Sequence, residues 1–316
     1  IGVAARQRGD IKVAEDAFAR ALERAPSHRL SLAAMGEVAA QAKDWTGAVK
    51  AKRSLLAGSS VEQRFQLFEE IGDIHALHLG DQRGGLSAYQ SAIELRPHSH
   101  VVLHKVLEIH TAEKNWPLAV ETLLRLGAEE HEPVRRSKIH YAAAVIARDE
   151  IKDDATAVVY FGKALDDVPE LPKAFASLER ILVDAADWKG LSRAYRNMIK
   201  RLGAHPPEDQ ALALWSRLGD LAREKLGDPE SAIAANEVAV TLEPANIERH
   251  EQLATLYLEA GADRADKAAT ELQFLLKRFP DRLALYRTLS KLYADTRQWD
   301  KAYCLASALV FLEQAG

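Results

Sequence analysis

The 316-residue sequence has few cysteines and no long apolar segments, the features that stabilise secreted proteins and cross membranes. Its one cysteine, Cys304, excludes a disulfide framework and fits a reducing compartment, so we expect a cytoplasmic protein. No run of about 18 apolar residues occurs, and the sequence therefore predicts no membrane span. No signal peptide is visible, but Ile1 opens a segment that reads as the middle of a helix, so we expect a fragment of a longer chain.

The sequence also lacks a basic excess and low-complexity segments. Lysine and arginine number 42 against 46 aspartates and glutamates, which gives a net charge of -4. This balance leaves no broad positive field for phosphate backbones, and we expect no nucleic-acid partner. The hydrophobic share of 47% and the charged share of 28% are typical of a folded protein.

Motifs for catalysis and cofactor binding are missing. No glycine loop is followed by a Lys-Ser or Lys-Thr pair, no strand precedes a glycine run, and neither a His-Glu-x-x-His motif nor a nucleophile elbow occurs. Because these motifs supply the phosphate, dinucleotide, zinc and acyl-transfer chemistry of common enzymes, the sequence predicts a non-catalytic protein without a cofactor.

Histidine pairs are the only candidate metal ligands. His100 and His104 lie four residues apart, and His75 and His78 lie three apart. No cysteine or carboxylate completes a four-ligand site beside either pair, so we expect no metal. Cys304 has no histidine nearby, and we expect a buried, unreactive thiol.

What the sequence does contain is an internal repeat. Nine copies of one frame recur at intervals of about 34 to 41 residues, a period typical of helical hairpin repeats. Four weaker copies centre on Ala48, Ala119, Leu191 and Ala302. The five clear copies are Ala14, Phe18, Ala21 and Pro26; Gly85, Tyr89, Ala92 and Pro97; Ala157, Phe161, Ala164 and Pro169; Ala232, Asn236, Ala239 and Pro244; and Ala268, Leu272, Leu275 and Pro280.

Three glycines lie inside helical patterns that precede these frames. Gly36, Gly72 and Gly219 each follow an apolar residue. An interior glycine costs a helix about 1 kcal/mol relative to alanine, so the position needs a reason. We expect the paired helix to approach too closely at each glycine for a larger side chain.

The clearest unit combines Trp215, Leu218, Gly219, Ala232, Ala239 and Pro244 and resembles the tetratricopeptide (TPR) signature. The resemblance covers nearly the whole chain. It implies an all-α fold, a right-handed α-solenoid (superhelix) of about nine TPR-like helix-turn-helix repeats with the first one truncated. We expect a single domain over residues 1–316, with a soft break at 203–209, where two prolines interrupt helix.

Two kinds of unit alternate along much of the chain. One kind carries a tryptophan before the frame, expected to pack in the turn between helices, where truncation to alanine would cost about 3–5 kcal/mol. The other kind has a longer turn, as at residues 79–84 and 226–229. The alternation indicates duplication of a two-repeat unit. The tryptophans are Trp45, Trp116, Trp188 and Trp299, and Asp44, Asn115 and Asp187 precede the first three as expected helix caps.

The last predicted helix, residues 303–312, is apolar where a terminal repeat is usually polar. Leu305, Leu309 and Leu312 form one stripe, and Val310 and Phe311 add to it. We expect further repeats or a capping helix beyond residue 316, with burial of this surface by a partner as the alternative.

In tetratricopeptide proteins the first helices line the concave groove, and the resemblance implies which side chains face it here. The expected set is acidic near one end and basic in the middle, which would orient a partner by charge. The alternative is that these are ordinary charges paired with neighbours such as Asp184, Asp220 and Glu224. The candidates are Glu37, Glu69, Asp73, Glu108, Lys138, Tyr141, Arg148, Lys173, Arg180, Arg217, Arg223, Glu251, Thr255, Arg287 and Lys291.

The resemblance implies a scaffold or adaptor that binds protein or peptide partners through this groove or along its edges. A role in a bacterial secretion, pilus, motility or polarity assembly is in keeping with the family. Two alternatives stay open: a peptide-sensing regulatory domain, and a substrate-selecting domain of an enzyme whose catalytic part lies outside this sequence. The lysine and asparagine pattern of chaperone-tail receptors is missing.

Overall fold

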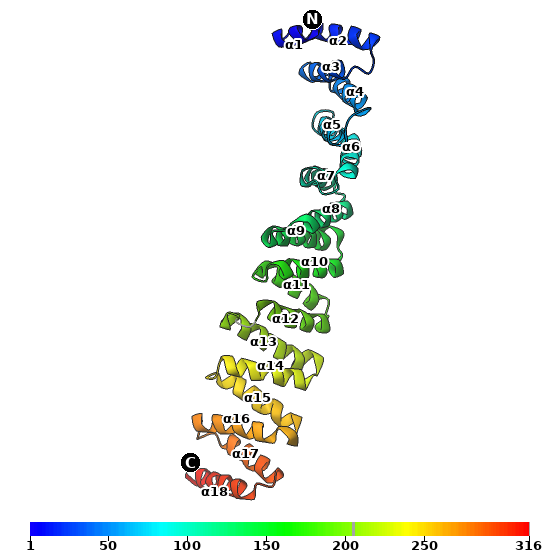
Figure 1. Ribbon diagram of the computed structural model, residues 1–316. Coiled ribbons are helices and arrows are strands. Elements are labelled where there is room, and N and C mark those ends of the chain that lie inside the picture. Colours follow the sequence, from blue (N-terminus) through cyan, green and yellow to red (C-terminus); the bar gives the residue numbers. More distant parts are fainter. Residues whose placement is uncertain (204–205, 316) are drawn as a thin grey trace. The chain divides into compact units, whose positions relative to one another are not determined.

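The computed structural model describes residues 1–203 and 206–315, which form 18 α-helices and no strand (Figure 1). Contacts divide the chain into two compact units, unit 1 (residues 1–167) and unit 2 (residues 168–316). The single domain with a soft break at 203–209 stays a prediction, and Ala204 and His205 of that segment lie outside the described residues.

Unit 1 consists of ten α-helices, two of which continue into a short π-helical end. They are α1 (Gly2–Arg8), α2 (Ile11–Arg24), α3 (Arg29–Gln41), α4 (Trp45–Leu56), α5 (Val61–Asp73) with η1 (Ile74–His78), α6 (Gln82–Leu95), α7 (His100–Ala112), α8 (Trp116–Glu129), α9 (Pro133–Ile146) with η2 (Ala147–Ile151), and α10 (Asp154–Asp167).

Unit 2 has eight α-helices in its described residues, with one π-helical end and one 3-10 turn. They are α11 (Pro172–Asp184), α12 (Trp188–Leu202), α13 (Glu208–Leu221) with η3 (Ala222–Leu226), α14 (Pro229–Leu242), α15 (Ile247–Ala260), η4 (Ala262–Arg264), α16 (Ala265–Arg278), α17 (Leu283–Asp295), and α18 (Trp299–Ala315).

The helices pair in sequence order as hairpins. Within each unit every α-helix packs against the helix before it and the helix after it. A hairpin has too little apolar surface to form a core alone, so each one is stabilised by its neighbours. The described residues therefore confirm the predicted all-α solenoid, with nine hairpins and a short first helix.

Small residues let the two helices of a hairpin approach closely. Ala157 and Ala232, at the start of the repeated frame, are 0% exposed. At Gly72 a Cβ atom would lie 2.3 Å from the ring of Tyr89, and at Gly219 one would lie 2.8 Å from the Asn236 amide nitrogen. Both glycines are thus required by the partner helix, as predicted.

The same expectation is wrong for Gly36. A Cβ atom there would lie 3.5 Å from the Cβ atom of Ala51, an ordinary van der Waals contact. The facing residue in α4 is an alanine rather than a large side chain, so the two helices leave room for a methyl group.

One class of hairpin closes with a compact turn. After α3, α7, α11 and α17, one residue adopts a left-handed conformation and the next donates its amide to a carbonyl five residues back, as from Asp187 to Leu182 at 2.9 Å. This is the hydrogen bond of a Schellman motif. The left-handed residues are Lys43, Lys114, Ala186 and Arg297, and none of them is glycine.

The other class closes with a turn that is one residue longer. The helices α5, α9 and α13 end in the π-helical segments, and Asp81, Asp153 and Asp228 each donate an amide to a carbonyl six residues back. The carboxylates of these three aspartates then cap the following helix. From α3 to α14 the two classes alternate strictly, which confirms the two kinds of unit indicated by the sequence.

The tryptophans lie at the turn between the two helices of a hairpin, as expected, but none of them is fully buried. Each one is the first residue of a second helix; Trp45, Trp116 and Trp188 are half-buried, and Trp299 is 64% exposed. The ring of Trp45 stacks on His78 at 3.8 Å between centroids. Each ring is therefore partly solvated at the rim of its hairpin, so the expected loss of 3–5 kcal/mol does not follow.

Two corresponding contacts join a tryptophan to the π-helical end of the next hairpin. His78 lies in η1, and Lys225 in η3 places its ammonium 5.4 Å from the ring of Trp188. Compact and long turns are thus linked by an aromatic contact in both units.

The apolar stripe of α18 lies partly on the surface. The helix packs against α17, while Tyr303, Val310 and Phe311 are exposed. Cys304 is exposed as well, so the expected buried thiol is wrong. The residue lies on the face turned away from α17, beside Tyr303. Further repeats or a capping helix beyond residue 316 stay a prediction.

Close packing at the repeated alanine predicts a cost for any larger side chain. We expect Ala157→Leu to lower the free energy of unfolding by about 1–3 kcal/mol through overpacking. Urea denaturation followed by circular dichroism measures the change. Ala155→Leu, at an exposed position of the same helix, is the control; equal losses in both variants would contradict close packing at Ala157.

The left-handed turn at Ala186 predicts a stabilising substitution. Ala186 has φ of 51°, which costs an L-residue about 1–2 kcal/mol relative to glycine. We expect Ala186→Gly to raise the free energy of unfolding by about 1 kcal/mol, measured by urea denaturation. Ala185→Gly, at φ of -80°, provides the matched control and should not stabilise; a destabilised Ala186→Gly would refute the argument.

Candidate partner-binding surfaces

In unit 1 the predicted acidic positions on the first helices form part of an ion-pair network. The ammonium of Lys105 on α7 lies 2.8 Å from a carboxylate oxygen of Glu69 and 2.8 Å from one of Asp73, both on α5. Tyr89 on α6 donates its hydroxyl hydrogen to Asp73 at 2.7 Å. Three consecutive helices are therefore joined by polar contacts as well as by their apolar faces.

The network shifts two pKa values upward. Burial raises the pKa of Tyr89, and its hydrogen bond to Asp73 raises it further. Burial by itself would lower the pKa of Lys105, but its hydrogen bonds to Asp73 and Glu69 outweigh that effect and raise it. Both protons are held at neutral pH, so Tyr89 and Lys105 serve as donors rather than as bases.

Ion pairs reduce the acidic character that the sequence predicted for the first helices of the N-terminal half. Arg6 forms an ion pair with Glu37, and Lys105 neutralises part of the charge of Glu69 and Asp73. Glu108 stays exposed beside this network. The surface of α3, α5 and α7 is therefore a mixture of charges rather than a uniform acidic patch.

The remaining candidates in unit 1 lie on α9 and η2. Lys138 is exposed, whereas Tyr141 packs edge-on against Phe161 at 5.6 Å between centroids. The guanidinium of Arg148 also lies 5.6 Å from the Phe161 ring and forms an ion pair with Asp149 at 2.7 Å. Tyr141 and Arg148 are thus anchored to α10 and have a structural role.

In unit 2 three of the predicted basic residues have acidic partners. Arg217 on α13 donates to Glu179 on α11 at 2.8 Å, and Glu179 also accepts the hydroxyl hydrogen of Tyr195. Arg223 pairs with Glu224 at 3.0 Å. The alternative of neighbouring ion pairs therefore describes Arg217 and Arg223, and Arg287 likewise pairs with Glu313 at 2.6 Å.

Three basic candidates stand free on the same first helices. Lys173 and Arg180 on α11 and Lys291 on α17 are exposed, and no ion pair involves them within the part of unit 2 that the structure describes. Glu251 on α15 pairs with Arg282, and Thr255 donates to the Glu251 carbonyl. The assignment of the whole set to partner binding stays a prediction.

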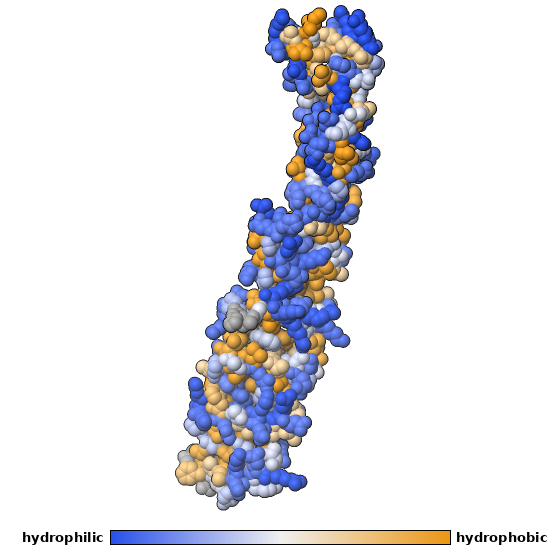
Figure 2. Space-filling view, viewed as in Figure 1, coloured by the Kyte–Doolittle hydropathy of each residue, from blue (hydrophilic) through white to orange (hydrophobic). Residues whose placement is uncertain are grey.

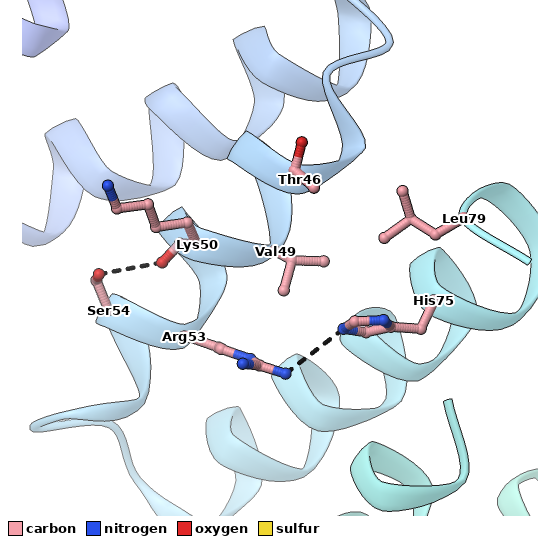
Figure 3. A pocket seen from close by; sticks show the side chains of 7 residues that line it. All are labelled: Thr46, Val49, Lys50, Arg53, Ser54, His75 and Leu79. Atoms are coloured by element: carbon pink, nitrogen blue, oxygen red, sulfur yellow. Dashed lines mark hydrogen bonds between the residues drawn. The ribbon is translucent and has the colours of Figure 1, made fainter. Parts of the chain in front are cut away.

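The structure also reveals a pocket that the sequence analysis missed. It has a volume of about 510 Å³ and lies between α4 and the end of α5 (Figure 3). It is lined by Thr46, Val49, Lys50, Arg53, Ser54, His75 and Leu79. Two cations and two hydroxyl groups border this pocket, which suits a polar or anionic group rather than an apolar ligand.

A chain of contacts places one of the cations in the pocket. The Nδ1 atom of His75 lies 2.9 Å from Asp81, and its Nε2 atom lies 3.5 Å from a guanidinium nitrogen of Arg53 (Figure 3). A Cβ atom at Gly84 would lie 2.5 Å from His75, so this glycine leaves room for the imidazole. His75 therefore orients Arg53 from a half-buried position.

In the described part of the chain, neither histidine pair lies in a cluster of possible metal ligands. There, no three or more His, Cys, Asp or Glu side chains are grouped so that they could hold a metal ion. His75 and His78 point to different neighbours, Asp81 and Trp45.

The same face recurs in unit 2 on the helix that corresponds to α4. Counted from Trp45 and Trp188, the positions of Lys50 and Arg53 are occupied by Arg193 and Arg196 on α12. The hydrogen bonds from Ser231 lower the pKa of Asp228, and Arg196 lowers it further, as Arg53 does for Asp81. The sequence signal for this face is a pair of cations three residues apart, five and eight residues after the tryptophan that begins the helix.

The visible surface is largely hydrophilic in both units (Figure 2). Orange patches on it are separated by hydrophilic residues. Among the described residues, no helix is both long enough and apolar enough to cross a membrane.

The Lys105 network predicts a measurable contribution to stability. We expect Lys105→Met to lower the free energy of unfolding of the chain by about 1–2 kcal/mol, because Glu69 and Asp73 would be left half-buried without a cation. Urea denaturation at pH 7 measures this loss, and Lys138→Met, at an exposed position, should change stability by less than about 0.5 kcal/mol.

The same variant carries a pH dependence. The pKa of Lys105 is raised in the folded state, so its contribution is fully present below the unfolded value of about 10.4 and is lost as pH rises through the folded value. The difference between wild type and Lys105→Met should therefore shrink at strongly alkaline pH. A constant difference would show that the loss comes from packing alone.

Comparison with known proteins finds similar solved structures but no matching sequence. No protein-family model matches the sequence, and no curated protein sequence matches it. Among solved structures, the chain is similar to YrrB, described as a TPR protein with an unusual peptide-binding site (17% identity, 62% of this chain and 94% of that one, TM-score 0.35).

Two further similar structures cover more of the chain. They are the C-terminal part of a TPR repeat-containing protein from Cytophaga hutchinsonii (15% identity, 80% of this chain and 98% of that one, TM-score 0.35) and a tetratricopeptide repeat protein from Parabacteroides merdae (15% identity, 84% and 98%, TM-score 0.35). Similarity at this level carries no inference about a partner. The sequential packing of the hairpins makes the described chain an α-solenoid, and its repeat frame resembles that of tetratricopeptide proteins.

Proposed function

We propose that this chain is a non-catalytic scaffold or adaptor that binds protein or peptide partners through the exposed side chains of its first helices. The observation that carries the proposal is the set of free cations Lys173 and Arg180 on α11 and Lys291 on α17. Stacking of the hairpins does not use these side chains, since the core of unit 2 is formed by buried apolar residues on the opposite faces.

Arginine is enriched at the energetic centres of protein interfaces because its planar guanidinium stacks and donates several hydrogen bonds. Arg180 is exposed on α11, while its helix is fixed by the buried residues Leu178, Ile181 and Leu182. A side chain on such a rigid helix loses little backbone entropy on binding. The surface of α11 would therefore favour a partner that offers a carboxylate.

The rest of the first-helix surface in unit 2 is mixed in charge. A shallow pocket of about 230 Å³ between η3 and α15 is lined by Arg223, Glu248, Glu251 and Thr255, among others. A partner segment with an acidic group against α11 and a basic group against α15 would match both regions. Such matching fixes orientation more than affinity.

The proposal also includes the cellular compartment and the type of assembly. We place the protein in the cytoplasm, in a bacterial secretion, pilus, motility or polarity assembly. The support is the resemblance of its repeats to tetratricopeptide proteins and the single cysteine.

Selection of binding peptides tests the proposed surface. Peptides that bind the purified chain would be selected from a displayed random library, and their dissociation constants measured by fluorescence anisotropy. We expect Arg180→Glu to weaken the selected peptides at least tenfold, because a hot-spot cation contributes about 1.4 kcal/mol or more.

Lys277→Glu provides the matched control. It makes the same change of net charge at an exposed position of the second helix α16 and should change affinity less than twofold. Equal weakening by both variants would point to overall charge, and unchanged affinity for Arg180→Glu would reject the first-helix surface.

A further inference from the structure

The helix α12 presents a continuous row of positive charge to solvent. Lys189, Arg193, Arg196 and Lys200 are exposed and follow each other at intervals of four, three and four residues. Residues with this spacing lie on one face of an α-helix. With Arg201 the helix has five cations and no acidic residue between Trp188 and Leu202.

The opposite face of α12 holds the row in place. Leu191, Ala194, Tyr195 and Met198 are buried against the neighbouring helices. At a rise of about 1.5 Å per residue, the four cations span about 16 Å. The row is therefore a rigid strip rather than a set of charges on a flexible loop.

In the described part of unit 2, acidic neighbours leave three of the four cations without an ion pair, while Arg196 lies close enough to Asp228 to lower the pKa of that carboxyl group. Arg196 donates a hydrogen bond to the neutral hydroxyl of Ser231 at 2.9 Å. No carboxylate in the described parts of unit 2 forms an ion pair with Lys189, Arg193 or Lys200. Like charges four residues apart repel one another and cost an isolated helix about 0.2–0.5 kcal/mol per pair, so an anionic partner would relieve repulsion as well as gain attraction.

We propose that the exposed face of α12 docks an acidic segment of a protein partner, a run of aspartates or glutamates. The inference rests on the proposed function in that the partner is a protein, and it assigns a face formed by a second helix rather than by the first helices. Every second side chain of an extended segment points to the same side, and these side chains lie about 6.6 Å apart. Successive cations on one face of a helix lie about 5–6 Å apart, so an extended acidic segment can place its carboxylates opposite the strip.

Two other anionic partners fit the strip less well. Amphipathic helices that bind membranes insert apolar side chains, whereas the apolar side chains of α12 are already buried in the core. Binding to nucleic acid is dominated by cation contacts with the phosphates, about six to ten of them in a strongly salt-dependent complex, and four cations on one helix supply fewer. Both become outcomes of the test.

The test uses the whole chain and a fluorescein-labelled peptide with eight consecutive glutamates, measured by fluorescence anisotropy at low and physiological salt. We expect binding by the wild type that weakens with salt, and at least a tenfold loss in the double variant Arg193→Glu/Lys200→Glu. The neutral variant Arg193→Gln/Lys200→Gln should lose affinity to a smaller degree, and circular dichroism verifies that each variant is folded.

The control is Lys277→Glu/Lys301→Glu, which makes the same change of net charge at exposed positions of α16 and α18 in the same unit and should lose less than twofold. No binding by the wild type, or equal loss in both double variants, would overturn the proposal. Tighter binding of a twelve-residue oligothymidylate or of phosphatidylserine vesicles, lost in the α12 variant, would overturn the choice of a protein partner.

The two proposals fail in different ways. Peptides selected from a library and lost with Arg180→Glu would support the first-helix surface even if the glutamate peptide does not bind. Loss of the glutamate peptide in the α12 variant, with selected peptides unaffected, would support only the face of α12.

Discussion

Close approach of neighbouring helices is the constraint on which this structure depends. The contact of Gly72 with the ring of Tyr89, and the full burial of Ala157 and Ala232, bring the two helices of a hairpin together where a larger side chain would separate them. Each hairpin then buries its remaining apolar face on the next one. The charged side chains that could meet a partner are those that this stacking leaves outside.

The polar contacts follow the same order as the packing. Lys105 reaches two carboxylates of the preceding first helix, and Arg217 reaches Glu179 in the same direction. A tyrosine of the intervening second helix joins the carboxylate in both cases, Tyr89 in unit 1 and Tyr195 in unit 2. Unit 1 and unit 2 thus repeat one arrangement of acid, tyrosine and base.

Much of the fold could be predicted from the sequence because its signals are local. The recurring small residue and the proline after each second helix define the hairpins. Asp44 and Asp187 cap the helices that they were expected to cap, whereas Asn115 makes no side-chain cap hydrogen bond, so that expectation is wrong. Contacts between hairpins were not predictable in the same way. Whether Glu69 is free or paired depends on a residue 36 positions later and on how the helices stack. Exposure of Cys304 depends likewise on what covers α18. The four cations on α12 recur at helical spacing in the sequence, but the tetratricopeptide resemblance implies a binding surface on the first helices only.

The longer turn has a consequence for length variation in this chain. Loops of most proteins accept an added or deleted residue, but the turn from His75 to Asp81 is closed by a backbone hydrogen bond over six residues and continues directly into α6. Loss of one residue would rotate the start of α6 by about 100° relative to α5. Gly85 and Tyr89 would then leave the interface with α5, and Gly72 would face a different side chain. The length of each turn therefore determines which face the second helix of a hairpin presents to the first.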